Sequence, residues 1–133
     1  MGGERIQRLA GDPPSPFEEP NGFSRLVVSG GFVFVGGTTS VDPTGVVLGE
    51  TPFEQAAEIL RKIEHELARV GAAMSDVVQT RMYVTDISRG EEVGRAHADV
   101  FGSAPPVTAM LEVSALFDPR MLVEIEAVAL APS

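Results

Sequence analysis

The stretch MLVEIEAVAL, residues 121–130, decides which fold this sequence can adopt. It is apolar except for Glu124 and Glu126, and proline-containing segments bound it on both sides. An apolar run of this length predicts a strand that is buried on both faces of a sheet. Because glutamate is seldom fully buried without a partner, the two carboxylates need an explanation of their own.

Alternation along this strand divides its side chains between the two faces of the sheet. The wholly apolar side, which we expect helices to cover, consists of Met121, Val123, Ile125 and Ala127. The other side carries both glutamates and consists of Leu122, Glu124, Glu126 and Val128. That side is too apolar for free water and too polar for a dry core. We therefore expect a subunit interface that contains a polar pocket.

The other strands are indicated by apolar alternation and by turn residues. Residues 4–9 predict a short strand, and the proline-rich segment GDPPSPFEEPNG after it predicts a loop. A hairpin is predicted where Ser29-Gly30-Gly31 separates the apolar runs 26–28 and 32–35. DPTG at 42–45 predicts a turn. Further strands are expected over 77–84, 107–113 and 121–130.

Two helices are predicted from capping residues and helical spacing. Thr51-Pro52-Phe53-Glu54 combines a capping box with proline at the first helical position, and Gly71 ends that helix. Its apolar stripe is Phe53, Ala56, Ala57, Leu60, Ile63, Leu67 and Val70. Its predicted solvated face is Glu54, Glu58, Arg61, Lys62, Glu66 and Arg69, with His65 at the boundary. Ser88 and Glu91 predict a second capping box, before a helix that ends at Gly102.

The predicted order β-β-β-α-β-α-β-β favours an α/β two-layer sandwich, with a mixed sheet of about six strands and two helices on one face. A chain of 133 residues suits a single domain, residues 1–133. Within it, residues 1–21 form an N-terminal strand and Pro/Gly-rich loop, and residues 22–130 form the core.

Composition excludes several classes of protein and site. The net charge is −9, from 10 basic and 19 acidic side chains, and this balance disfavours nucleic-acid partners. The chain has no cysteine and two histidines, so we expect no disulfide and no metal site. No cofactor is expected either. No apolar segment approaches the ~20 residues that cross a bilayer, and no secretory signal is present. A soluble cytoplasmic protein without membrane partners is expected.

Several segments together resemble the Rid family, also called YjgF or L-PSP. They are the hairpin ending in VGGTTSVDPTG, the helix FEQAAEILRKIEHELARVGAAMSDVV, the strand TRMYVTD, and a Pro-x5-Glu-Val segment followed by VEIEA. The resemblance covers about residues 22–130, in order and spacing. It implies a homotrimer of chorismate-mutase-like subunits with small-molecule clefts between them. It also implies hydrolysis of reactive enamines and imines to 2-oxo acids and ammonia.

Carried over residue by residue, the resemblance gives an incomplete site. It places the water-handling glutamate of the last strand on Glu124. The position of an arginine that clamps the substrate carboxylate falls on Thr108. An aromatic that is commonly tyrosine is Phe23, a serine position is Gly36, and an asparagine position falls near Gly94. Gly37, Thr38 and Met110 complete the implied substrate-binding set.

Three other residues are candidates for this site, each with a plain structural alternative. Arg25 could replace the missing clamp or be a surface residue at a strand start. Arg81 could also replace it, or form a structural ion pair with Glu124 or Glu126. His97 could form a polar wall of the cleft, contributing to substrate binding, or pack at the edge of its helix.

Three functions follow from this reading. The first is hydrolysis of an enamine, imine or related small metabolite by Glu124 and water. The second is non-catalytic binding of a small metabolite by a trimer. The third, endoribonuclease activity or translation inhibition, is disfavoured by the acidic charge and by the lack of a histidine or lysine constellation.

Overall fold

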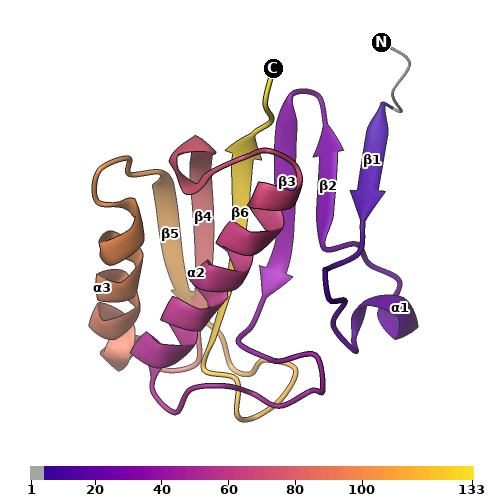
Figure 1. Cartoon of the computed structure of the whole chain (residues 1–133). Coiled ribbons are helices and arrows are strands. Elements are labelled where there is room, and N and C mark those ends of the chain that lie inside the picture. Colours follow the sequence, from indigo (N-terminus) through magenta and orange to yellow (C-terminus); the bar gives the residue numbers. More distant parts are fainter. Residues whose placement is uncertain (1–4) are drawn as a thin grey trace.

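The structure is a computed structural model that describes residues 5–133. Figure 1 shows a twisted sheet with its two long helices on one face. The six strands are β1 (Ile6–Leu9), β2 (Leu26–Ser29), β3 (Phe32–Thr38), β4 (Val77–Val84), β5 (Val107–Glu112) and β6 (Val123–Leu130). They lie in the order β1-β2-β3-β6-β4-β5, with β4 and β5 parallel and the other neighbours antiparallel. The predicted two-layer fold is confirmed.

The stretch quoted first lies in the middle of this sheet, because β6 pairs with β3 on one side and β4 on the other. Val123, Ile125, Ala127 and Ala129 are buried beneath the helices. Glu124 and Glu126 alternate with them and are only half-buried. The predicted division of the strand between two faces is therefore confirmed, with the strand beginning at Val123 rather than 121.

The long helices are α2 (Pro52–Arg69) and α3 (Gly90–Phe101). Thr51 and Glu54 form the predicted capping box, each side chain accepting from the other's backbone N–H. The second predicted box is wrong, because α3 has no side-chain cap, and the backbone N–H of Ser88 itself donates to Asp86. Asp86 caps the short 3-10 helix η2 (Ile87–Arg89), and α3 begins after it at Gly90.

Two further short elements interrupt segments that were expected to be irregular. The first is helix α1 (Glu18–Asn21), inside the Pro/Gly-rich segment, and the second is the 3-10 helix η1 (Met74–Asp76) before β4. Helix α1 ends at Gly22, whose φ of 70° lies in the left-handed region that glycine adopts readily. The segment from Ala10 to Asn21, which joins β1 to β2, folds into a compact strap beyond the ends of these two strands (Figure 1).

The side of the sheet away from the helices carries exposed apolar side chains. Phe34 is 45% exposed, Leu111 46% and Val107 70%, and all three lie on this side by strand alternation. Such a patch on one face is typical of a surface that another subunit covers.

Candidate functional site

A cavity of about 710 Å³ opens beside the strap, and its size suits a small molecule. Its walls are the strap, the end of β3 with the loop that follows, helix α2, and the loop before β6. The predicted site residues that line it are Phe23, Arg25, Gly37, Thr38 and Glu124. One chain thus brings together half of the predicted site.

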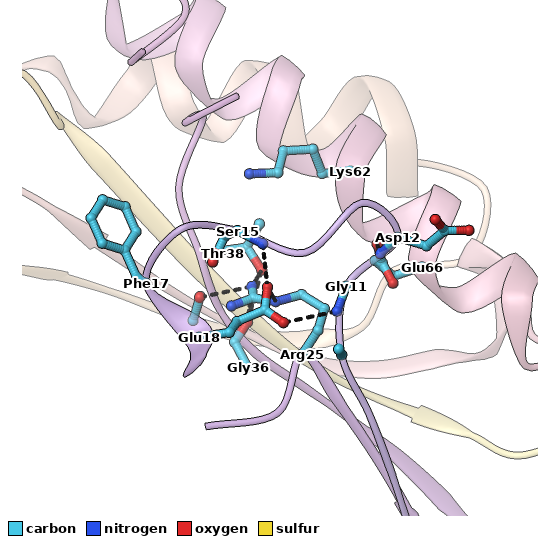
Figure 2. Close-up of polar contacts among 12 residues, drawn as sticks. Gly11, Asp12, Ser15, Phe17, Glu18, Arg25, Gly36, Thr38, Lys62 and Glu66 are labelled. Carbon is cyan, nitrogen blue, oxygen red and sulfur yellow. Dashed lines mark hydrogen bonds and ion pairs between the residues drawn. The ribbon is translucent and has the colours of Figure 1, made fainter. Parts of the chain in front are cut away.

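Arg25 lies in the wall of this cavity, with a side chain only 9% exposed. Its Nη1 donates to the carbonyl of Gly37 at 3.0 Å. It also donates to Oγ1 of Thr38 at 2.7 Å (Figure 2). Its Nε has no hydrogen-bond partner and lies 3.9 Å from Oε2 of Glu18. The alternative of a surface arginine is wrong, because the guanidinium is buried and fixed.

The electrostatic surroundings of Arg25 explain how a buried cation is tolerated. Burial lowers its pKa, and the carboxylates of Glu18, Glu66 and Glu124 counteract that effect. Three acidic groups therefore surround one guanidinium, which remains positively charged at any physiological pH.

Glu18 anchors the strap from inside and was not predicted as a site residue. Its carboxylate accepts from the backbone N–H of Gly11 and of Ser15, both at 2.8 Å (Figure 2). Burial opposes ionisation, but these hydrogen bonds and Arg25 together hold the pKa of Glu18 below its usual value. The sequence signal was weak, because Glu18 stands in a proline-rich segment without helical or strand periodicity.

Glu124 enters the cavity from β6, and the chain leaves room for it at Gly37. A Cβ atom at position 37 would lie 2.3 Å from Oε2 of Glu124, so any larger residue would displace the carboxylate. The pairing of β3 with β6 is irregular between Val35 and Thr38, which is where the carboxylate passes β3. Burial raises the pKa of Glu124, Arg25 partly offsets this, and Glu126 adds to it.

The remaining predicted residues do not line this cavity. Gly94 and His97 lie on α3 and Thr108 and Met110 on β5, while Gly36 borders a separate depression that Arg81 and Glu126 also line. Oγ1 of Thr80 lies 2.8 Å from Nε2 of His97 and donates to Oγ1 of Thr108 at 2.8 Å. These hydrogen bonds link His97 through Thr80 to Thr108, which is exposed. The ring of His97 also packs against that of Phe101. Burial lowers its pKa.

Arg81 does not reach the cavity. It lies 3.6 Å from Oε1 of Glu126, which also accepts from the hydroxyl of Tyr83 at 2.5 Å. The structural ion pair predicted for Arg81 is confirmed, with Glu126 and not Glu124 as its partner. Of the two glutamates in the central strand, Glu126 is paired, and Glu124 faces the cavity.

Helix α2 contributes side chains that were predicted to face solvent. Glu66 is 6% exposed and accepts from the backbone N–H of Asp12, while Lys62 is half-buried against the cavity. The exposed His65 contacts the strap through the carbonyl of Asp12. Helical spacing could have predicted the burial of Lys62 and Glu66, because positions 55, 59, 62 and 66 share one face of the helix. Gln55 and Ile59 on that face are buried.

Residues 5–133 hold no group of three His, Cys, Asp or Glu side chains placed to bind a metal ion. No helix within them is long and apolar enough to cross a membrane.

Comparison with known proteins links the chain to one family. Residues 15–131 match the family described as Endoribonuclease L-PSP. An uncharacterized protein of Streptomyces coelicolor is 33% identical over 126 residues, covering 95% of this chain and 92% of that protein. Reactive Intermediate Deaminase A, chloroplastic, of Arabidopsis thaliana is 27% identical, covering 80% of this chain and 57% of that protein.

A solved structure shows the same fold. The crystal structure of Rv2704 from Mycobacterium tuberculosis, described as a member of the YjgF/YER057c/UK114 family, is similar with a TM-score of 0.84 and 45% sequence identity. The similarity covers 95% of this chain and 99% of that one.

Proposed function

The chain belongs to the Endoribonuclease L-PSP family, also known as Rid or YjgF, and from that premise we propose that it hydrolyses an enamine, an imine or a related small metabolite. The reaction would use Glu124 and a water molecule in the cavity beside the strap. The deaminase name of the Arabidopsis relative supports this class of reaction.

The observation that carries the proposal is the environment of Glu124. Among residues 5–133 it is the carboxyl group whose pKa is raised overall, and burial is the main cause. A carboxyl group with a raised pKa takes up and releases a proton closer to neutral pH, as a general acid or base must. No hydrogen bond or ion pair within the described chain occupies its oxygens, so they are available to a water molecule.

The chemistry follows from these groups. Glu124 takes a proton from water while the water oxygen bonds to the imine carbon. The imine nitrogen takes up that proton, which gives a carbinolamine. The hydroxyl proton of the carbinolamine then passes through Glu124 to the nitrogen, the C–N bond breaks, and ammonia leaves as the carbonyl product forms. Arg25 lies within electrostatic reach of Glu124, and it lines the same cavity, so its positive charge would attract an anionic group of the substrate. Arg25 is our candidate for binding the substrate carboxylate, because this chain has Thr108 at the position where the family carries an arginine for that role.

We further propose that the chain acts as a homotrimer. The exposed apolar face of the sheet supports this assembly, since it would otherwise remain in water. Neighbouring subunits would then bring His97 and Thr108 of one chain toward the cavity of the next, completing the cleft with Gly94 and Met110.

The test measures ammonia release from imines generated enzymatically from several amino acids. We expect the wild-type protein to accelerate release and Glu124→Gln to reduce the rate at least about 100-fold, as loss of a general acid–base does. Glu64→Gln, an exposed carboxylate on α2, is the matched control and should keep full activity. Equal rates for the wild type and Glu124→Gln would contradict the proposal.

A second candidate, non-catalytic binding of a metabolite, is favoured by one observation. Thr108 provides a hydroxyl and no charge at the position where the family carries its clamp, and that hydroxyl already bonds Thr80. In that case the imines would not turn over, while a metabolite at 100 times its dissociation constant would still stabilise the fold by ~2.7 kcal/mol.

A further inference from the structure

Lys62 is the only lysine among the 133 residues, and it lines the cavity beside the strap. The other nine basic side chains, from a total of 10 Lys and Arg, are arginines. Arginine stays protonated in proteins, whereas a lysine amine can lose its proton and act as a nucleophile. The cavity therefore contains the one ε-amine that this chain has.

Two backbone carbonyls hold that amine in place. Its Nζ donates to the carbonyl of Thr39 at 2.6 Å and to that of Val41 at 2.8 Å. An uncharged amine has two hydrogens and one lone pair on a tetrahedral nitrogen. Both hydrogens can point at these carbonyls, which leaves the lone pair free for the cavity.

The charged neighbours of Lys62 do not form an ion pair with it. Glu58 pairs with Arg61, and Glu66 pairs with Arg69. Among residues 5–133 no ion pair involves Lys62. The like charge of Arg25 lies close enough to repel the ammonium form, and together with burial, the larger effect, it lowers the pKa of Lys62 to about 8.

We propose that the ε-amine of Lys62 is a covalent binding site for small aldehydes and ketones, which it captures as a Schiff base inside the cavity. The uncharged nitrogen adds to the carbonyl carbon and gives a carbinolamine. One of the two amine protons moves to the former carbonyl oxygen when the carbinolamine forms. The second amine proton then moves to that hydroxyl group, the C–O bond breaks, and water leaves as the C=N bond forms. Amine and carbonyl compound thus become imine and water, and hydrolysis reverses the reaction. The site does not require Glu124.

The experiment traps the Schiff base by reduction. The full-length protein is incubated at pH 7 with glyoxylate or with propanal, treated with cyanoborohydride, and mapped by peptide mass spectrometry. The variant Arg8→Lys supplies an exposed lysine in the same molecule as an internal reference. We expect Lys62 to be labelled at least about tenfold faster than the lysine introduced at position 8, because an ordinary exposed lysine has a pKa near 10.4.

Two controls keep the result interpretable. Lys62→Arg preserves the charge and the donors but not the nucleophile, so its labelling at position 62 must vanish while its thermal unfolding midpoint stays close to that of the wild type. In concentrated urea the preference for Lys62 must also vanish. Labelling of Lys62 no faster than the exposed reference would overturn the proposal, as would a preference that persists in urea. Retained imine hydrolysis in Lys62→Arg would leave the role of Glu124 intact and separate the two proposals.

Discussion

At the scale of single residues, Glu124 links the cavity to stability as well as to chemistry. Its pKa is raised from the ordinary value of 4.5, so the folded state holds the proton more tightly than the unfolded chain does. Below the ordinary value both states are protonated, and the carboxyl group imposes no ionisation cost. As the pH rises from the ordinary value toward the raised pKa, the unfolded chain loses this proton before the folded state does, and the free energy of unfolding falls.

Replacement by glutamine should therefore stabilise the protein in a pH-dependent way. We expect Glu124→Gln to unfold at the same urea concentration as the wild type near pH 4, and at a higher one near pH 8. Urea titrations across this range measure the difference, with Glu64→Gln as the exposed control. A stability gain that shrinks as the pH rises would show that burial of the charge is not the dominant effect.

Single residues also show where prediction from sequence succeeded. Glu124 and Glu126 could be separated from the rest of their strand because alternation is a local property of the backbone. Alternation alone does not show which of them is paired, since the answer depends on Arg81 and on Tyr83, which lies 43 residues before Glu126. The burial of Arg25 could not be predicted from the sequence either, because its hydrogen-bond acceptors lie on β3 and the nearby carboxylate of Glu18 lies in the strap.

Among the elements, the strap is the segment whose structure hydrophobic periodicity predicted least well. Its proline content excluded long helices and strands, and residues 11–22 were expected to be loop only. The structure holds this segment to the body through side chains of other elements. His65, Glu66 and Arg69 of α2 all contact its backbone, and Glu18 fixes it from within.

Removing the charge of Glu18 should loosen the strap. Glu18→Gln replaces one acceptor oxygen by an amide donor that faces the N–H of Gly11 or Ser15, and it removes one of the three carboxylates that surround Arg25. We expect a loss of about 1–3 kcal/mol in unfolding free energy at pH 7, the cost of an unsatisfied buried polar group. Because the pKa of Glu18 is lowered, this loss should diminish as the pH falls through that value.

Urea unfolding monitored by circular dichroism measures the effect. The matched variant is Glu19→Gln, whose carboxylate is the exposed neighbour in the same short helix. It should change stability by no more than about 0.5 kcal/mol, as surface substitutions do. Equal losses in both variants would mean that net charge, and not the anchoring of the strap, is responsible.

At the scale of the whole molecule, the exposed face of the sheet predicts assembly. Phe34 and Leu111 lie on that face, and a charge placed at either would be buried without a partner in a trimer. We expect the double variant Phe34→Glu/Leu111→Glu to give a monomeric mass by light scattering and an unchanged far-UV spectrum. Val46→Glu, at an exposed apolar residue in the loop before α2, is the control and should remain trimeric. A monomeric wild type would refute the assembly.

The fold as a whole was more predictable than the site. The order of the elements along the chain and the helices on one face follow from hydrophobic periodicity and capping residues, which one chain carries in full. The site depends on side chains that meet from distant segments, and half of its predicted members face away from the cavity within one chain. Periodicity contains no information about a neighbouring subunit, so the sequence alone could not show how that second half is used.

The central position of β6 sets the order in which the protein can be made. The strand that joins β3 to β4 is the last to be synthesised, so the β1–β3 and β4–β5 parts share no backbone pairing until it arrives. Until then two strand edges stay unpaired, and such edges associate readily with other chains. The nascent protein thus cannot complete its sheet during translation until residues 123–130 have left the ribosome, and any partner that protects it must act on an incomplete sheet.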